Sequence, residues 1–261
     1  MTFLKKVLEG KKRVVKDAKA KTTLSELKQM IVGIEKRPFY QVFSERFPKE
    51  VKIIAEVKKA SPSRGVLVND LDLPGLLMDY ERGGASAISV ITEEKYFNGS
   101  LAYVSEAKKF VNLPVLRKDF IVDEYEIYQA KAAGADAILL IGEALDANQI
   151  AEYLDIARQT DIDVLLEVHS MKTYEKVADL RGFIFGINNR NLETLKVDLS
   201  VSHEIIGNIS ETLPVIVESG IEERSHIESF TEQGVSGFLI GTSLIVSGDP
   251  YNKLRELCGK I

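Results

Sequence analysis

Charged side chains stand at the ends of several short apolar runs in this 261-residue sequence. They are Glu56, Lys58, Lys118, Glu167 and Glu218. Burying a charge is costly unless the charge is paired or functional. Charged residues that recur at the same end of several apolar runs therefore indicate a shared site. Ammonium groups bind anions and donate protons, and carboxylates accept protons or stabilise cations. We expect acid–base chemistry on an anionic substrate, with a structural ion pair as the alternative for each residue taken alone.

The last two apolar runs lead into glycines and hydroxyl residues. VIVE continues as Ser219-Gly220, and FLI continues as Gly241-Thr242-Ser243. Glycine lets a ligand approach the backbone closely, and N–H groups at a helix start attract phosphate. We therefore predict a phosphate site here, with ordinary helix capping by Thr242 as the alternative.

The segment ASPSRG, residues 60–65, follows the first of these runs. Its polar composition predicts a long, mobile loop. We interpret the loop as a lid that brings Ser61 near a ligand anion, and a plain connector is the alternative.

Eight such runs recur along the chain, and each is followed by an amphipathic stretch that reads as a helix. They start near Lys52, Ser86, Pro114, Asp136, Asp163, Phe183, Pro214 and Gly237. Their spacing of about 20 to 35 residues is typical of one strand–helix unit, and strands that are apolar throughout belong to a parallel sheet covered on both faces. We predict an α/β fold, a (β/α)8 TIM barrel. The rival, an open doubly wound sheet, lacks support because no G-x-G-x-x-G follows KIIAEVK.

In such a barrel the charged run ends lie together at the carboxyl ends of the strands. The opposite ends carry Pro114, Pro214 and Asp163, which we interpret as turn residues. Residues 1–50 read as a helical extension, with a capping box from Thr23 to Glu26 and a basic face that we expect to be solvated. We expect residues 1–261 to form a single domain.

Composition narrows the class of protein. The net charge of −5 argues against a nucleic-acid partner, and no apolar run is long enough for a membrane span or a signal peptide. One cysteine, Cys258, and three histidines argue against an internal disulfide or a metal cage. We expect a cytoplasmic protein with a small phosphorylated ligand and no metal; the oligomeric state stays open, with a monomer as the working expectation.

Six motifs, in order along the chain, together resemble the indole-3-glycerol-phosphate synthase family. They are IIAEVKKASPSRG, PVLRKDFIVDEYEIYQAKAAGADAILLI, LLEVHS, GINNRNL, VIVESGI and FLIGTSL. The resemblance spans the chain from about residue 50 to its end, and the basic extension is similar to that of the family. It implies a cofactor-free lyase of tryptophan biosynthesis that converts 1-(2-carboxyphenylamino)-1-deoxyribulose 5-phosphate to indole-3-glycerol phosphate, CO2 and water. Thr242 stands where a serine is common.

The resemblance also implies roles. Lys118 corresponds to the general acid of ring closure, Lys58 to the partner of the substrate carboxylate or a second acid, and Glu167 to a base or iminium stabiliser. The residues that orient these groups would be Glu56, Asn188, Arg190, Glu218 and Ser219. The phosphate and loop contacts would be Ser61, Gly220, Gly241 and Thr242. Phe120 would be an apolar wall for the aromatic ring, with a core aromatic as the alternative.

The proposed chemistry fits these residue types. A lysine crowded by other cations in a low-dielectric site would have a lowered pKa and donate its proton more readily. Decarboxylation needs an electron sink, which the cyclised iminium provides without a cofactor. Two alternatives remain from the residues: a non-catalytic barrel that senses a sugar phosphate, and a sugar-phosphate isomerase. We expect His169 to be a structural histidine, with tuning of Glu167 as the alternative.

Overall fold

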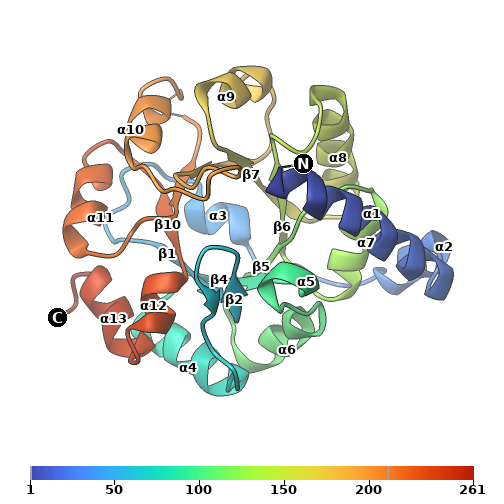
Figure 1. The fold of residues 1–261 in the computed structure, drawn as a ribbon, viewed down its shortest axis with the longest axis horizontal. Helices are drawn as coiled ribbons and strands as arrows, with labels where there is room; N and C mark the ends of the chain where they lie inside the picture. The colour runs from blue at the N-terminus through green and yellow to red at the C-terminus, as the bar shows by residue number, and fades with distance from the viewer. Residues whose placement is uncertain (1, 211) are drawn as a thin grey trace.

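In the computed structural model, which describes residues 2–210 and 212–261, eight parallel strands form a closed barrel (Figure 1). They are β1 (Ile53–Val57), β4 (Ala87–Ile91), β5 (Val115–Lys118), β6 (Ala137–Ile141), β7 (Asp163–Val168), β8 (Ile184–Asn188), β9 (Val215–Glu218) and β10 (Gly237–Ile240). β1 pairs with both β4 and β10, which closes the ring. All eight predicted runs are strands, and the predicted (β/α)8 barrel is confirmed.

Helices surround the barrel, as Figure 1 shows. They are α4 (Leu73–Gly83), α6 (Ala102–Phe110), α7 (Tyr125–Ala132), α8 (Ala147–Gln159), α9 (Met171–Val177), α10 (Ser200–Ile206), α11 (Arg224–Thr231) and α13 (Pro250–Leu257), with the short α5 (Glu94–Phe97) and α12 (Thr242–Val246). Gly84 and Gly134 end α4 and the α7 region with φ of 103° and 90°, a conformation that favours glycine. Among the described helices, none is both long and apolar enough to cross a membrane.

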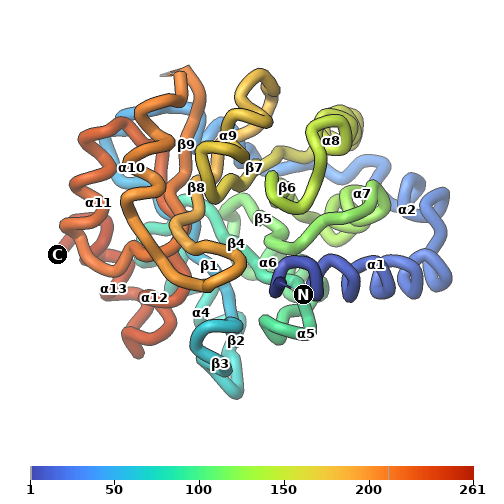
Figure 2. The backbone as a smooth tube through the Cα atoms, turned by 45° about the horizontal axis from the view of Figure 1, so that its top comes forward, coloured from blue at the N-terminus to red at the C-terminus, as the bar shows by residue number. Residues whose placement is uncertain are grey.

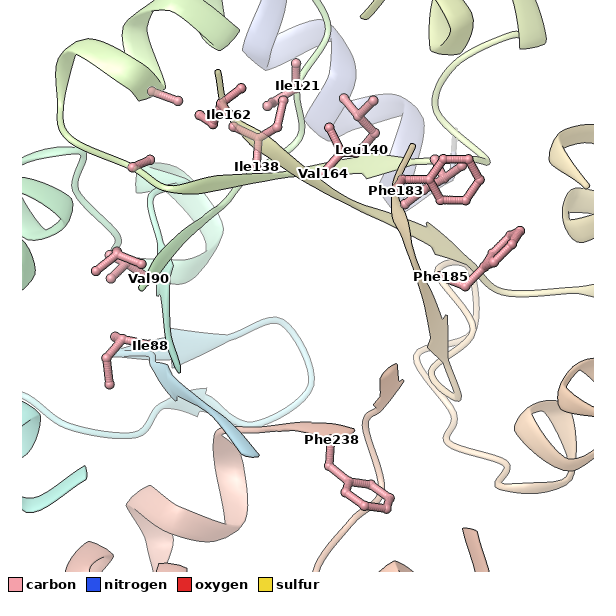
Figure 3. Packing of buried hydrophobic residues seen from close by; sticks show 14 of the residues in the cluster. Ile88, Val90, Ile121, Ile138, Leu140, Ile162, Val164, Phe183, Phe185 and Phe238 are labelled. Atoms are coloured by element: carbon pink, nitrogen blue, oxygen red, sulfur yellow. The ribbon is translucent and has the colours of Figure 1, made fainter. Parts of the chain in front are cut away.

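Alternation along each strand creates two apolar layers. One set of side chains points outward and packs under the helices, as Ile88, Val90, Phe185 and Phe238 do in Figure 3. The other set points inward and fills the barrel; it comprises residues such as Ile54, Leu116, Leu139, Leu165, Ile184, Ile216 and Leu239. Because successive side chains of a strand point to opposite faces, the residue two positions after each of these also points into the barrel.

Four of those next inward positions carry charged residues: Glu56, Lys118, Glu167 and Glu218. Glu56 lies two residues after Ile54, Lys118 two after Leu116, and Glu167 two after Leu165. The barrel is therefore apolar at the amino ends of its strands and charged at their carboxyl ends. The side-chain period of the strands, and not a loop conformation, brings the charged residues together.

The N-terminal extension is helical, as predicted, and it reaches both ends of the barrel. It consists of α1 (Phe3–Lys21), α2 (Leu24–Met30) and α3 (Phe39–Phe43). Figure 1 shows α3 in the middle of the ring of strands, where Phe39 and Phe43 join the inner apolar layer. Figure 2 shows α1 and α2 passing beside α7. The predicted capping box between Thr23 and Glu26 is present.

Two expectations for the extension and its contacts were wrong. Lys11 on α1 does not belong to a solvated face, because its ammonium is buried against Asp119 and Glu126 at 2.9 and 2.7 Å. Asp163 is more than a turn residue, because its carboxylate accepts hydrogen bonds from Lys36 Nζ and Tyr40 N, both at 2.8 Å. Each contact joins the extension to the barrel across a long stretch of sequence.

The segment after β1 also differs from the long loop that we expected. It forms a two-stranded hairpin of β2 (Ala60–Ser61) and β3 (Gly65–Val66). Ser61 Oγ accepts a hydrogen bond from Arg64 N at 3.2 Å, which closes the turn. Figure 2 shows the hairpin standing out from the barrel on the side where α5 lies.

Candidate active site

A cavity of about 390 Å³ opens at the carboxyl ends of the strands. All the residues predicted for the site line it: Glu56, Lys58, Ser61, Lys118, Phe120, Glu167, Asn188, Arg190, Glu218, Ser219, Gly220, Gly241 and Thr242. They come from every strand of the barrel except β4 and β6, or from the loops that follow. Ile91 of β4 and Ile141 of β6 add apolar lining.

Lys118 occupies the centre of the charged cluster. Its Nζ lies 2.8 Å from Glu167 Oε2 and 2.7 Å from Glu218 Oε2. Desolvation lowers the pKa of this ammonium, but the charges of Glu167, Glu218 and Glu56 outweigh it, so the pKa is raised. The expectation that cations crowd this lysine was wrong, because carboxylates surround it and keep it protonated.

The two carboxylates on Lys118 differ in charge. Burial and the neighbouring Glu167 raise the pKa of Glu218 to about 8, although Lys118 opposes the shift. Burial also disfavours ionised Glu167, but Lys118 and His169 hold its pKa well below the usual range. Two carboxylates beside one ammonium cannot ionise equally, so Glu167 keeps the negative charge. Gly186 leaves room for Glu218 Oε1, which a Cβ at that position would strike.

Asn188 holds Glu167 from the neighbouring strand. Its Nδ2 donates to Glu167 Oε2 at 3.1 Å, and its Oδ1 accepts from Arg190 N at 2.9 Å. The amide thereby fixes both the carboxylate and the start of the loop that carries Arg190. This geometry matches the orienting role that the resemblance implies for Asn188.

Glu56 of β1 and Lys58, directly after the strand, form a second ion pair, with 2.6 Å between Oε1 and Nζ. Gly241 lies against this pair: a Cβ there would come within 2.5 Å of Glu56 Oε1 and 2.9 Å of Glu56 Cβ. The glycine therefore permits the loop after β10 to approach β1. An ammonium next to the cavity and an approachable backbone form a surface suited to an anion.

The loops after β9 and β10 meet at the predicted phosphate end. Ser219 and Gly220 have φ of 65° and 84°, and Asn189 Nδ2 holds this turn by donating to Ser219 O at 3.0 Å. Ser243 Oγ donates to Ile221 O at 3.0 Å and ties the two loops together. Gly241 occupies the N-cap position of α12, so Thr242 is not the N-cap that the alternative interpretation required.

Aromatic rings form one wall of the cavity. Phe120 lines the cavity and also belongs to the inner apolar layer, so it is a core aromatic, and its role as a wall for the substrate ring stays a prediction. Phe97 packs on it with 6.3 Å between ring centroids. Phe3 of α1 lines the cavity too and contacts Tyr96 edge-on at 5.2 Å. The extension thus contributes to the site as well as closing the far end of the barrel.

The hairpin after β1 borders the cavity. Its Pro62, Ser63 and Arg64 belong to the lining together with Ser61. Arg190 Nη1 lies 3.4 Å from Ser63 Oγ, and Arg64 Nη2 lies 3.5 Å from Glu222 Oε1. These long, exposed contacts connect the hairpin to the loops across the cavity mouth.

Sequence reasoning missed Lys11, Arg117 and Thr92, which support this cluster. All three donate to Asp119, and these contacts lower the pKa of Asp119 to about 2 against the effect of burial. The sequence did contain a signal for Arg117: it is a charged residue in the middle of a strand, at a position where the side chain points outward and is covered by helices. His169 was expected to be structural, yet its Nε2 lies 3.2 Å from Glu167 Oε1.

Comparisons with known proteins show the family of this chain. The family model described as indole-3-glycerol phosphate synthase matches residues 4–257. Proteins of that name from Desulfosudis oleivorans and Campylobacter jejuni are each 38% identical, over 98% of this chain and 98% or 99% of their own length.

Solved structures share the fold at low identity. The tryptophan synthase A-subunit from Pyrococcus furiosus has a TM-score of 0.61 at 14% identity, over 83% of this chain and 99% of its own. A 3-hexulose-6-phosphate synthase has a TM-score of 0.60 at 19% identity, over 81% and 99%. The barrel, the charged cluster and the matched length agree, and the chain belongs to the indole-3-glycerol phosphate synthase family of tryptophan-biosynthetic carboxy-lyases.

Proposed function

We propose that this family member closes the indole ring of 1-(2-carboxyphenylamino)-1-deoxyribulose 5-phosphate, with Lys118 as the general acid. The observation that carries the proposal is the position of Lys118 Nζ, between Glu167 and Glu218 inside the cavity. As the ring carbon that bears the carboxylate attacks the ribulose carbonyl, charge builds on the carbonyl oxygen. An alkoxide is far more basic than an amine, so an ammonium of raised pKa still transfers its proton to it.

The later steps need a second acid and a carboxylate. Loss of CO2 sends its bonding electrons to the ring iminium, so no cofactor is required. The hydroxyl formed in ring closure then leaves as water, protonated by Lys58, while a proton leaves the adjacent CH2 group. Ionised Glu167 stabilises the iminium or accepts that proton. The products are indole-3-glycerol phosphate, CO2 and one water, which balances the substrate.

The cavity offers partners for both anions of the substrate. The phosphate would bind where Gly220, Gly241 and Thr242 meet, and the aromatic ring would lie against Phe120. Lys58 would pair with the anthranilate carboxylate. The site residues all belong to one barrel, which supports the proposal of a single catalytic domain. A cytoplasmic location fits membership of a family of biosynthetic enzymes, and the monomer stays a prediction.

Indole fluorescence tests the proposal directly, because the chain has no tryptophan. The protein would be incubated with the substrate, without added metal or cofactor, and emission followed over time. Emission should rise, and Lys118→Ala should lower kcat by at least about 10²-fold. Lys109→Ala, at an exposed lysine of α6, is the matched control. Near wild-type turnover by Lys118→Ala would remove Lys118 from the role.

The alternatives give different results in the same assay. A sugar-phosphate isomerase would act on a ketose phosphate that lacks the anthranilate carboxylate. A sensor barrel would bind the phosphorylated substrate and produce no emission. Either result would replace the proposed lyase reaction.

A further inference from the structure

A buried carboxylate–imidazole–carboxylate chain runs from the cavity lining into the protein: Glu167 lines the cavity, whereas His169 and Glu143 lie behind it. His169 follows β7 directly, and only 5% of its side chain is exposed. Its Nδ1 lies 2.8 Å from Glu143 Oε2, and its Nε2 lies 3.2 Å from Glu167 Oε1. The ring therefore bridges the loop after β6 and the catalytic carboxylate.

Glu143 is built to hold this ring. Besides Nδ1, it accepts the backbone N–H of His169 on Oε1 at 2.9 Å, so both of its oxygens engage one residue. The loop that carries it is anchored by Gly142 N, which donates to Glu167 O at 2.8 Å, and by Lys176 of α9, which donates to Gly142 O and to Leu145 O. Gly142 also has to be glycine, because a Cβ there would lie 2.5 Å from Thr173 Cγ2.

Both oxygens of Glu167 are consequently engaged. Oε2 accepts from Lys118 and Asn188, and Oε1 faces His169. A bare lone pair on either ring nitrogen would be repelled by the carboxylate oxygen that it faces, so Nδ1 opposite Glu143 and Nε2 opposite Glu167 each carry a proton. Because Lys118 and Asn188 favour ionised Glu167, the proton at Nε2 belongs to the imidazole, and His169 with both protons is an imidazolium.

We propose that His169 is a positioning residue for the ring-forming reaction, holding Glu167 ionised and oriented toward Lys118 while Glu143 holds His169. The inference rests on the proposed function of Glu167. Five ionisable groups adjoin this chain or belong to it: Lys118 on β5, Glu143 after β6, Glu167 on β7, Glu218 on β9 and Lys176 on α9, while the charge of Glu56 on β1 acts on Lys118. A permanently charged Glu167 suits stabilisation of the cationic intermediate.

The charges of Glu167 and Glu143 support this assignment. They raise the pKa of His169 to about 10, although burial opposes the shift. The same contact lowers the pKa of Glu143. The imidazolium and both carboxylates thus stabilise each other's charged forms.

Kinetics with three variants test the role. His169→Phe keeps the ring volume but removes both N–H groups, and kcat should fall by about 10²-fold with little change in KM, as for a misplaced catalytic group. The acidic limb of the kcat profile should move to higher pH, because Glu167 loses a cation that keeps it ionised. His169→Gln restores an N–H near the Nε2 position and should recover part of kcat. His203→Gln, at a histidine stacked on Phe230 far from the cluster, is the control.

A second readout is independent of turnover. The chain has three histidines, so ¹⁵N spectra of the rings are readily assigned, with His169→Gln identifying the resonance. His169 should stay doubly protonated to about pH 9 in the wild type and lose its proton at lower pH in Glu143→Gln. This measurement also decides the matter if His169→Phe does not fold.

The outcomes separate the two proposals. Wild-type kcat and an unshifted pH profile in folded His169→Phe would overturn the role of His169, as would a neutral ring at neutral pH in the wild type. Absence of turnover by the wild type would instead refute the lyase function. The ring spectra would then still report whether His169 is the imidazolium held by Glu143.

Discussion

Lys11 and Asp119 lie 108 positions apart in the sequence and form an ion pair of 2.9 Å, with 7% and 1% of their side chains exposed. Asp119 directly follows Lys118. The same carboxylate oxygen also accepts from Arg117 and Thr92, and Lys11 reaches Glu126 as well. The N-terminal helix is therefore connected electrostatically to the strand that carries the proposed general acid.

Removal of the Lys11 charge should destabilise the protein. Lys11→Met leaves buried carboxylates short of one cation, and the free energy of unfolding should fall by about 3 kcal/mol. The kcat should fall too, because the support next to Lys118 is lost. Denaturant unfolding and steady-state kinetics measure both effects. Lys12→Met, at an exposed neighbour on α1, is the control, and equal stability of the two variants would contradict the importance of the ion pair.

Glu218 should make stability depend on pH. Burial is the main cause that raises its pKa from 4.5 to about 8 in the folded protein. The stabilising contribution of the protonated carboxyl is therefore fully present below the pKa of the unfolded chain. It is lost as pH rises through the pKa of the folded protein. Glu218→Gln removes this titration. Relative to wild type, the variant should therefore gain more in Tm at about pH 9 than at about pH 5.

Thermal unfolding at the two pH values tests the role of Glu218. Glu222→Gln, at an exposed carboxylate of the neighbouring loop, should show no such difference. An offset in Tm that is the same at both pH values for Glu218→Gln would show that Glu218 does not titrate in this range.

Gly241→Ala should weaken substrate binding. The added Cβ would meet Glu56 Oε1 at 2.5 Å and Glu56 Cβ at 2.9 Å, so the backbone after β10 or the Glu56–Lys58 pair must move. KM should rise by at least about tenfold, equivalent to about 1.4 kcal/mol. Gly10→Ala is the control, since nothing lies within 4 Å of its Cβ, and it should stabilise α1 by about 0.5 to 1 kcal/mol. Unchanged KM in Gly241→Ala would argue against this backbone as part of the binding site.

Asn189 should control the Ser219 turn. Its amide donates to Ser219 O, while its Oδ1 accepts from the backbone N–H and hydroxyl of Ser202. Asn189→Ala leaves those buried groups unpaired, and the free energy of unfolding should fall by about 2 kcal/mol. KM should rise because Ser219 is released from its left-handed conformation. Asn191→Ala, at an exposed residue nearby, should change KM little; a similar KM for both variants would show that the turn holds itself.

The sequence by itself determined the barrel and the residues that line the cavity at one end of it. Eight short runs that are apolar throughout indicate strands buried on both faces, and a closed parallel sheet brings their carboxyl ends together. Lys118 and Glu167 therefore had to share one end of the barrel wherever the helices packed. The apolar runs and their repetition are visible in the linear sequence, which is why the barrel could be predicted from it.

Tertiary structure alone decided which charges face one another. Lys11 belongs to a basic helix that resembles a solvated one, and only the packing of α1 brings it to Asp119. His169 reaches Glu167 because Gly142 and Lys176 hold Glu143 opposite it. Carboxylates rather than cations surround Lys118, which reversed the expected direction of its pKa shift. These relationships depend on distances of a few ångströms between residues far apart in sequence, and Coulomb interactions in a desolvated site vary steeply over such distances.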